Sequence, residues 1–232
     1  MASGAKQSQT RRERRAEIID ATRALLDEQG VQDAPIDQIA RAAGINKAQI
    51  YRYFESKDEL LALTLDRYLE ELDVELGKAS TITDAVDRLD ELIRTLIDYT
   101  FDHPAFLDCT FALMRQPAGE LTAGMSEGAM FRLGRALGRC VEHLAACLRD
   151  GAEAGVFVAR DPETLANLIC AQALGMMQLG RVGAGVRMTG GGFPEIFPLD
   201  HKLLHEACRN GVLASVGASR QRGAADAAAS AG

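Results

Sequence analysis

The segment 44–61, GINKAQIYRYFESKDELL, crowds an amide, several cations and aromatic rings into a short stretch. Gln49 can donate to and accept from adenine through one side-chain amide, and Lys47 and Arg52 can donate to guanine. Each good pair of this kind discriminates between bases by roughly 1–3 kcal/mol. Ala48 leaves room for close approach of the backbone or for a thymine methyl group. These four side chains have the chemistry needed to read base edges in the major groove of DNA.

Lys57 and the neighbouring aromatic residues indicate contacts to phosphate. A cation at the first position of a helix opposes the helix dipole, at a cost of roughly 0.3–1 kcal/mol. The conflict disappears when a phosphate lies there, because backbone N–H groups and the Lys57 ammonium then share one anion. We expect Tyr51 and Tyr53 to combine packing with phosphate contact, and Phe54 and Ile50 to point into the core. The alternative is a solvated lysine beside rings that serve only packing.

A helix-turn-helix would position these side chains. Pro35 can open a short helix that Gly44 closes. Asn46 can cap a second helix over residues 47–54, and Gln49, at its third position, can reach back to the cap. Two short helices joined at a glycine form a unit whose second helix is able to enter the major groove.

Helical spacing of apolar residues continues on both sides of this unit. A preceding helix is expected to end at Gly30, and Ser56 with Glu59 forms an S-x-x-E capping box for a following helix that ends near Gly77. No strand alternation is found, and TGGGFPEIFP, residues 189–198, is interpreted as a loop. Further helices are predicted over residues 84–102, 104–115, 121–150, 162–183 and 199–216. The predicted fold class is all-α.

The charge of the chain is unevenly divided. A formal net charge of −7 argues, on its own, against a nucleic-acid partner. Residues 1–57 nevertheless carry 10 Lys and Arg against 8 Asp and Glu, whereas residues 58–232 carry 16 against 25. A basic end on an acidic body is the asymmetry expected for a phosphate partner. Four arginines could follow the DNA backbone or form a merely solvated arm: Arg11, Arg12, Arg14 and Arg15.

The run IDQIARAAGINKAQIYRYFESKDELL, residues 36–61, closely resembles the N-terminal DNA-binding domain of the TetR family of transcriptional regulators. The likeness is carried by IA-xx-AG-I, by the IY-x-YF recognition helix and by the SK-x-EL start of the next helix, and it extends over about residues 11–76. The resemblance implies phosphate contacts from Tyr51, Tyr53 and Lys57. It implies groove contacts from Lys47, Ala48, Gln49 and Arg52.

Two positions depart from the family pattern. Pro35 stands where the family often has a capping threonine that contacts phosphate, which weakens one expected contact. Asn46 replaces the usual serine and keeps the cap.

The resemblance also implies a larger helical domain that dimerises through its last two long helices and often encloses a small ligand. The expected organisation is a disordered arm (1–10), a helix-turn-helix domain (11–57), a connecting helix (58–77), a helical regulatory and dimerisation domain (78–217) and a disordered tail (218–232).

Small residues on the late helices suit close approach to a partner subunit. Ala171, Gly175 and Leu179 recur every four residues in an uncharged run, and Leu204 and Ala207 offer the last helix a similar face. We expect these residues to form the interface of a two-fold dimer. Such a dimer would present two recognition helices about one DNA turn apart, so a palindromic operator is expected.

Methionine and phenylalanine concentrate after residue 100 and predict an adaptable pocket for a largely apolar ligand of unknown identity. Ordinary core packing is the alternative for each residue. The ligand would act by favouring a dimer geometry whose recognition helices no longer match the grooves. The expected lining residues are Tyr99, Phe106, Cys109, Phe111, Met114, Met130, Met177 and Gln178.

Two stripes of cysteine and histidine share helical faces and could bind a soft metal, although buried cysteine and interface histidine are commoner. They comprise Cys140, His143 and Cys147, and His201, His205 and Cys208. No metal or cofactor is expected. An enzyme is not expected either, because no GxSxG, HExxH, P-loop or dinucleotide fingerprint occurs.

The predicted function is a homodimeric, ligand-released repressor of a palindromic DNA operator. The alternative is a nonspecific or structural DNA-binding protein, and a helical enzyme is a remote one. Residues 1–17 are almost wholly polar and lack the apolar region of a signal peptide, and the uncharged run 164–180 is shorter than a bilayer span of about 20 residues. We therefore expect a cytoplasmic protein with no membrane partner.

Overall fold

The computed structural model describes residues 2–29 and 34–217. The chain forms two compact units, each built from two stretches of sequence. The first unit holds residues 1–74 and 99–140, and the second holds residues 75–98 and 141–232. The expected all-α fold class is confirmed, with one small sheet as an exception.

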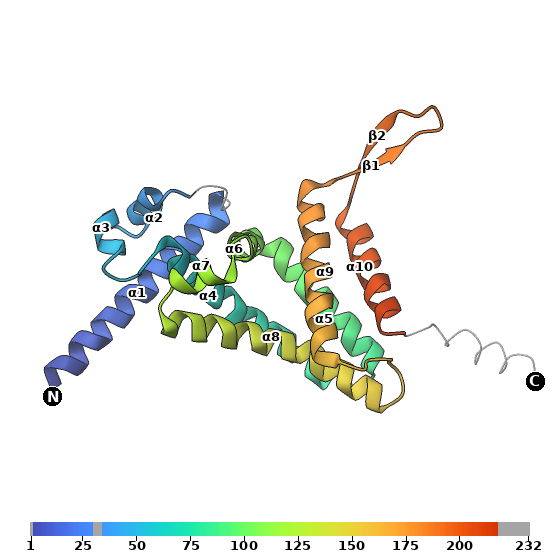
Figure 1. Cartoon of the computed structure of the whole chain (residues 1–232), viewed down its shortest axis with the longest axis horizontal. Coiled ribbons are helices and arrows are strands. Elements are labelled where there is room, and N and C mark those ends of the chain that lie inside the picture. Colours follow the sequence, from blue (N-terminus) through green and yellow to red (C-terminus); the bar gives the residue numbers. More distant parts are fainter. Residues whose placement is uncertain (1, 30–33, 218–232) are drawn as a thin grey trace, which may run out of the picture. The chain divides into compact units, whose positions relative to one another are not determined.

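The first unit packs short helices against one long one. It contains α1 (Ala2–Gln29), α2 (Ile36–Ala42), α3 (Lys47–Ile50), most of α4 (Lys57–Gly77), the end of α5 (Ala85–Asp102), α6 (Pro104–Met114), α7 (Ala118–Ala123) and the start of α8 (Glu127–Glu153). α2 contacts both α1 and α3 (Figure 1). Ile18 of α1, Ile39 of α2 and Ile50 of α3 are wholly buried, so apolar burial fixes the helix-turn-helix on α1.

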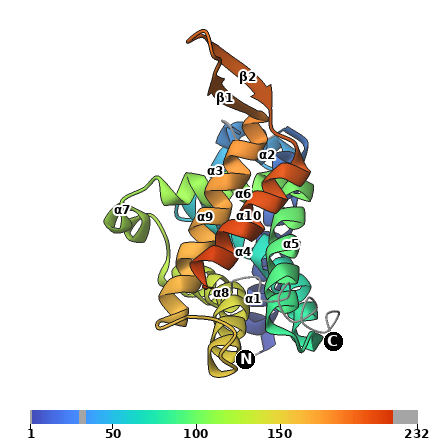
Figure 2. The same cartoon turned by 90° about the vertical axis from the view of Figure 1, so that its right-hand side faces the viewer.

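The second unit is dominated by two helices that lie side by side (Figures 1 and 2). It contains the end of α4, the short 3-10 helix η1 (Lys78–Thr81), most of α5, the end of α8, α9 (Pro162–Val182), β1 (Ala184–Met188), β2 (Pro194–Pro198) and α10 (His201–Ser215). Asp161 caps α9 by accepting from Thr164 N, at 3.0 Å, with Pro162 in the first turn. This confirms the helix start predicted at residue 162.

The interpretation of residues 189–198 as a loop is wrong for the part that forms β2. β1 and β2 pair antiparallel from Ala184 with Pro198 to Met188 with Pro194. The turn is closed by the N–H of Thr189, which donates to the Phe193 carbonyl at 2.9 Å. Prolines at both ends of β2 and a run of glycines hide the strand signal, because both residue types are rare inside strands.

Other boundaries also differ from those predicted. The helix expected over residues 121–150 is divided, because α7 ends at Ala123 and Ser126 starts α8 by accepting from Ala129 N. α3 ends at Ile50, and residues 51–53 form a turn. α1 begins at Ala2, so residues 2–10, expected as a disordered arm, are part of a helix. Gly30 and the tail 218–232 lie outside the described residues.

In the described part of the chain, no helix is both long enough and apolar enough to cross a membrane.

Candidate DNA-binding surface

The turn between α2 and α3 is built as the sequence predicts. Gly44 has φ +64°, a left-handed conformation that favours glycine, and the N–H of Ile45 donates back to the Ala40 carbonyl at 2.9 Å. Asn46 then caps α3 in a full capping box. Its side chain accepts from Gln49 N at 2.9 Å, and the Gln49 side chain accepts from Asn46 N at 3.0 Å. The predicted helix-turn-helix is confirmed.

One side of α3 is exposed. Lys47, Ala48 and Gln49 lie in solvent, whereas Ile50 is wholly buried against the unit. The Lys47 ammonium lies 3.8 Å from an Asp37 carboxylate oxygen, an exposed pair that holds the side chain only weakly. All three predicted groove residues of α3 are therefore accessible to a ligand as large as a DNA duplex.

The residues after α3 divide between surface and core. Tyr51 is 47% exposed and Arg52 is exposed, Tyr53 is half-buried, and Phe54 is 2% exposed. Phe54 belongs to the core, as predicted from its spacing. The two tyrosines have the mixed exposure that their expected double role requires.

Lys57 is the first residue of α4, as predicted, and is partly exposed. Ser56 provides the expected cap by accepting from Glu59 N at 2.9 Å. The capping box differs in one bond, because the Glu59 carboxylate accepts from the N–H of Glu55 and not from that of Ser56. Asp58 and Glu59 also lie in the first turn and offset part of the unfavourable effect of Lys57 on the helix dipole.

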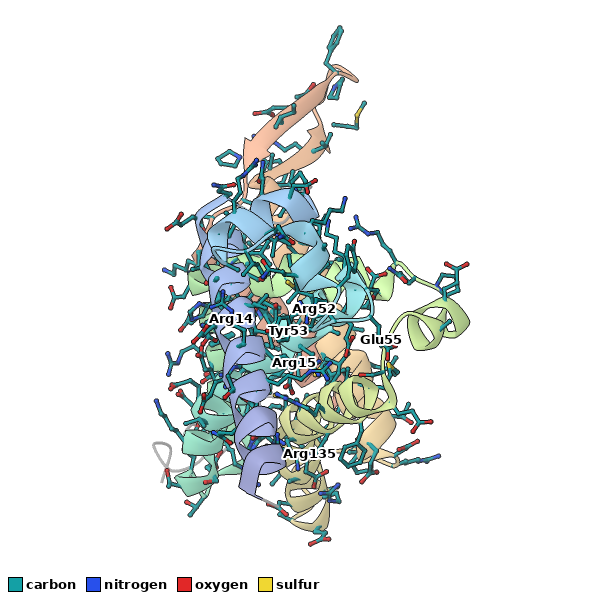
Figure 3. The ribbon with its side chains drawn as sticks, turned by 90° about the vertical axis from the view of Figure 1, so that its left-hand side faces the viewer. Arg14, Arg15, Arg52, Tyr53, Glu55 and Arg135 are labelled. Carbon is teal, nitrogen blue, oxygen red and sulfur yellow. The ribbon has the colours of Figure 1, made fainter. Side chains whose placement is uncertain are left out.

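Arginines of α1 hold the helix-turn-helix, a role that their spacing does not reveal. Arg11 donates to the Arg52 carbonyl at 3.2 Å, and Arg14 donates to the Ala43 carbonyl at 3.4 Å. Arg15 pairs with Glu59 at 3.1 Å, and its guanidinium lies 5.0 Å from the centre of the Phe54 ring. Figure 3 shows Arg14 and Arg15 of α1 beside Arg52 and Tyr53. Arg11, Arg14 and Arg15 therefore help to hold the candidate DNA-binding surface in position on α1.

Glu59 is the buried centre of this support. Its side chain is 2% exposed and accepts from Arg15, from Glu55 N and from the Ser126 hydroxyl at 2.6 Å. Ser56 adds a second hydrogen bond to the segment between α7 and α8, because its hydroxyl donates to the Gly124 carbonyl at 2.6 Å. The residues that start α4 are thus bonded to the segment between α7 and α8. This junction could not be predicted from the sequence, because nothing local pairs residue 59 with residue 126.

Residues 18–63 match the family model described as Bacterial regulatory proteins, tetR family. The N-terminal part of the chain, which holds the helix-turn-helix, is therefore a TetR-type domain. The chain is 33% identical over 111 residues to the uncharacterized HTH-type transcriptional regulator Rv1255c of Mycobacterium tuberculosis (strain ATCC 25618 / H37Rv). The match covers 47% of this chain and 54% of that one, so the chain spans about half the length of this relative.

Two solved structures share the fold over most of the chain. RolR in complex with resorcinol has a TM-score of 0.66 at 19% identity and covers 91% of both chains. FadR from Bacillus subtilis in complex with stearoyl-CoA has a TM-score of 0.62 at 15% identity, over 87% of this chain and 98% of that one. At these identities the likeness shows a TetR-type fold.

The predicted pocket residues are divided between the two units and differ in burial. In the first unit, the Tyr99 ring meets Phe106 edge to face at 5.7 Å, and Cys109 is wholly buried. Phe111 and Met130 are half-buried, and Met114 is 61% exposed. In the second unit, Met177 is buried and Gln178 is exposed. Tyr99, Phe106 and Cys109 thus remain as the interior cluster of the predicted set.

Polar groups surround this cluster. The Tyr99 hydroxyl donates to the Tyr68 carbonyl at 2.8 Å, and the Tyr68 hydroxyl donates to Asp27 at 2.7 Å. Burial raises the pKa of both hydroxyls above the ordinary value and raises the pKa of the Cys109 thiol to about 12. All three groups are therefore protonated near neutral pH and can act as hydrogen-bond donors.

The predicted dimer residues separate into two sets. Ala171, Gly175 and Leu179 on α9 are exposed, and so is Ala207 on α10. Leu204 is buried, at 6% exposure, and belongs to the interior of the second unit. Leu204 therefore does not belong to the exposed set. We call the exposed set the α9–α10 surface: Ala171, Gly175, Leu179 and Ala207.

Three of the cysteines are buried, Cys109, Cys147 and Cys208, whereas Cys140 and Cys170 are partly exposed. The Cys140 thiol donates to the Leu69 carbonyl and the Cys147 thiol donates to the Ala85 carbonyl. All five cysteines lie among the described residues, and none forms a disulfide. Over residues 2–29 and 34–217, no group of three or more His, Cys, Asp or Glu side chains is placed to hold a metal ion.

Proposed function

We propose that this chain is a sequence-specific DNA-binding transcriptional regulator. The observation that carries the proposal is the exposed side of α3, where Lys47 and Gln49 project from a capped helix whose opposite side is buried, with Arg52 exposed in the turn that follows. A short helix held in this way can enter the major groove, while Tyr51 and Lys57 contact the flanking phosphates. The family match over residues 18–63 supports this interpretation.

Gln49 would read a base while remaining a cap residue. Its carbonyl oxygen accepts from Asn46 N, and its NH2 group stays available to donate to a base acceptor. Bidentate contact with adenine also needs the second lone pair of the same carbonyl oxygen. We infer that the capping box orients the Gln49 amide before DNA arrives.

The regulator would act as a homodimer through the α9–α10 surface. Its small residues permit close approach of helices from two subunits. Two recognition helices related by a two-fold axis would bind a palindromic operator, and occupation of that operator would repress transcription.

A small, largely apolar molecule would release the operator. The interior cluster of Tyr99, Phe106 and Cys109 offers apolar rings with polar groups at its edge. RolR and Bacillus subtilis FadR were both solved with organic ligands, which supports a search among such molecules. The ligand must favour one dimer geometry over the other to change DNA affinity.

Competition binding tests the DNA-binding proposal. Labelled duplexes selected from a genomic library by the protein are competed with random duplex of equal length at about 150 mM salt. A sequence-specific regulator prefers its selected site by about a thousandfold or more. Equal competition by random duplex would instead support nonspecific or structural DNA binding. The genes beside the selected sites would then direct the choice of candidate ligands.

A further inference from the structure

The β1–β2 hairpin has two chemically different faces. Residues directly opposite each other in an antiparallel pair share a face, as do residues two positions apart along a strand. The register pairs Val186 with Ile196 and Met188 with Pro194. One face therefore consists of apolar residues alone, and we call it the hairpin apolar face: Ala184, Val186, Met188, Pro194, Ile196 and Pro198.

The large side chains of this face lie in solvent. The exposed fractions are 70% for Val186, 66% for Met188 and 74% for Ile196. Phe193, in the turn, is also 74% exposed. A contiguous patch of this kind marks an interaction surface, whereas single exposed apolar residues are ordinary. A two-stranded hairpin is also only marginally stable in water without a surface to pack on.

The opposite face is satisfied within the hairpin. Two Arg187 nitrogens, Nε and Nη2, each donate to the Glu195 carboxylate at 2.9 Å, and the guanidinium lies 5.4 Å from the centre of the Phe197 ring. The Phe197 ring also covers Gly185, where an added Cβ would lie 2.5 Å from a ring carbon. These contacts leave the apolar face as the side on which a partner can bury large side chains.

Short junctions join the hairpin to α9 and α10. Gly183, with φ +69°, ends α9 and directly precedes β1, and its carbonyl accepts from Leu199 N at 3.0 Å. Asp200 then caps α10 by accepting from Leu203 N at 2.7 Å. Figure 2 shows the hairpin extending from the ends of these two helices. Nothing as long as a flexible linker separates the hairpin from the α9–α10 surface.

We propose that the hairpin apolar face packs on a second copy of this chain. The proposal rests on the homodimer of the proposed function and extends its interface. Exposed apolar side chains also lie at the end of α9 that leads into the hairpin, where Leu179 is 47% exposed and Val182 is 65% exposed. Each subunit would contribute one hairpin, as the symmetry of a two-fold dimer requires.

The size of a stable interface favours the same occupant. A standard interface buries about 800 Å² on each partner, and homodimer interfaces are more apolar than the average protein surface. The α9–α10 surface provides close approach through Ala171, Gly175 and Ala207 but few large side chains. The hairpin adds its own large apolar side chains to those that the two helices expose outside this surface, which are Leu168, Val182 and Leu203.

Sedimentation equilibrium over a dilution series tests the proposal. The hairpin variant carries Val186→Ser with Ile196→Ser. A matched control carries Val74→Ser with Phe131→Ser, two first-unit residues that are 66% and 70% exposed. A third variant, Gly175→Glu, puts a charge on the α9–α10 surface, where an added Cβ meets nothing within 4 Å in the subunit. Helical circular dichroism establishes that each variant is folded.

The hairpin variant should raise the dimer Kd at least about tenfold, while the control leaves it unchanged. A wild-type protein that is monomeric throughout would overturn both the dimer and the hairpin proposal. A dimer weakened by Gly175→Glu but not by the hairpin variant would overturn the hairpin proposal alone.

Hydrogen exchange of the wild-type protein gives a second measurement that does not depend on the variants folding. Backbone amides of residues 184–198 should be more protected above the dimer Kd than below it. Equal protection at both concentrations would overturn the proposal.

Discussion

Lys57 is unfavourable for the dipole of its helix but well placed to bind a phosphate. It stands at the first position of α4, where Asp58 and Glu59 compensate part of its charge, and the residue is partly exposed to solvent. A lysine in this place is explained by local structure only in part. The remaining explanation is a phosphate that shares the ammonium with the first N–H groups of α4.

Lys57→Ala should therefore weaken binding to all DNA sequences and reduce the slope of log K against log salt by about 1, because one phosphate contact is lost. Gln49→Ala should instead reduce the preference for the selected site. Fluorescence anisotropy titrations at several salt concentrations measure both quantities. Lys78→Ala removes an exposed lysine outside the surface and should change neither. Equal and uniform losses from Lys57→Ala and Gln49→Ala would contradict the assignment.

The backbone conformation at residue 44 requires a glycine, although there is room for a larger side chain. An alanine Cβ there would meet nothing within 4 Å, but the φ of +64° is unfavourable for any residue with a Cβ. Gly44→Ala should lower the free energy of unfolding by about 1–2 kcal/mol. Gly134→Ala, at an exposed position inside α8 with no close neighbours, should raise it by about 0.5–1 kcal/mol. Urea titrations measure both changes in the free energy of unfolding. If the two changes have the same sign, the backbone conformation is not the reason for glycine at residue 44.

At the scale of elements, the start of α4 depends on a single buried carboxylate. Glu59 accepts from Arg15 on α1, from Glu55 N and from Ser126 at the start of α8. A charged group buried among three donors is stable only while all of them remain in place. The segment after α3 is thus positioned jointly by α1, α4 and α8.

Glu59→Gln should destabilise the protein by roughly 2–3 kcal/mol, because the amide keeps the shape but removes the charge that Arg15 faces and places NH2 near another donor. Ser126→Ala removes one hydrogen bond and should cost about 1 kcal/mol. Thermal denaturation monitored by circular dichroism ranks the two variants. A larger loss from Ser126→Ala would show that the junction is centred on the serine.

What the sequence predicted at this scale was local. The capping box of Asn46 and Gln49, the glycine turn and the starts of α4 and α9 all lie within a few residues of the side chains that specify them. The bond between Glu59 and Ser126 and the pair of Arg132 with Asp66 join residues far apart in the chain, which no periodicity encodes.

The hairpin escaped prediction for a different reason. Its strands are five residues each, and β2 is bounded by Pro194 and Pro198, so the period of two has little length in which to appear. The candidate DNA-binding surface could be predicted because its marks are contiguous. The pocket set could not be predicted as well, because apolar residue type alone does not separate buried Phe106 from exposed Met114.

At the scale of the whole molecule, no linker segment separates the two compact units where the chain passes from one to the other. The chain passes from one unit to the other after residues 74, 98 and 140. These points lie inside α4, α5 and α8 respectively. A helix interior cannot act as a flexible linker unless its hydrogen bonds open, so separate unfolding of one unit would also require these helices to open.

We therefore expect both units to unfold in one cooperative transition. Two buried thiols report on them separately, because burial raises the pKa of Cys109 in the first unit to about 12 and that of Cys208 in the second to about 11. Near pH 8 both are protonated and shielded, so alkylation requires opening. Pulsed alkylation along a urea series, read by peptide mass spectrometry, should give both sites the same midpoint. Two distinct midpoints would instead establish that one unit unfolds before the other and that α4, α5 and α8 open when the first unit unfolds.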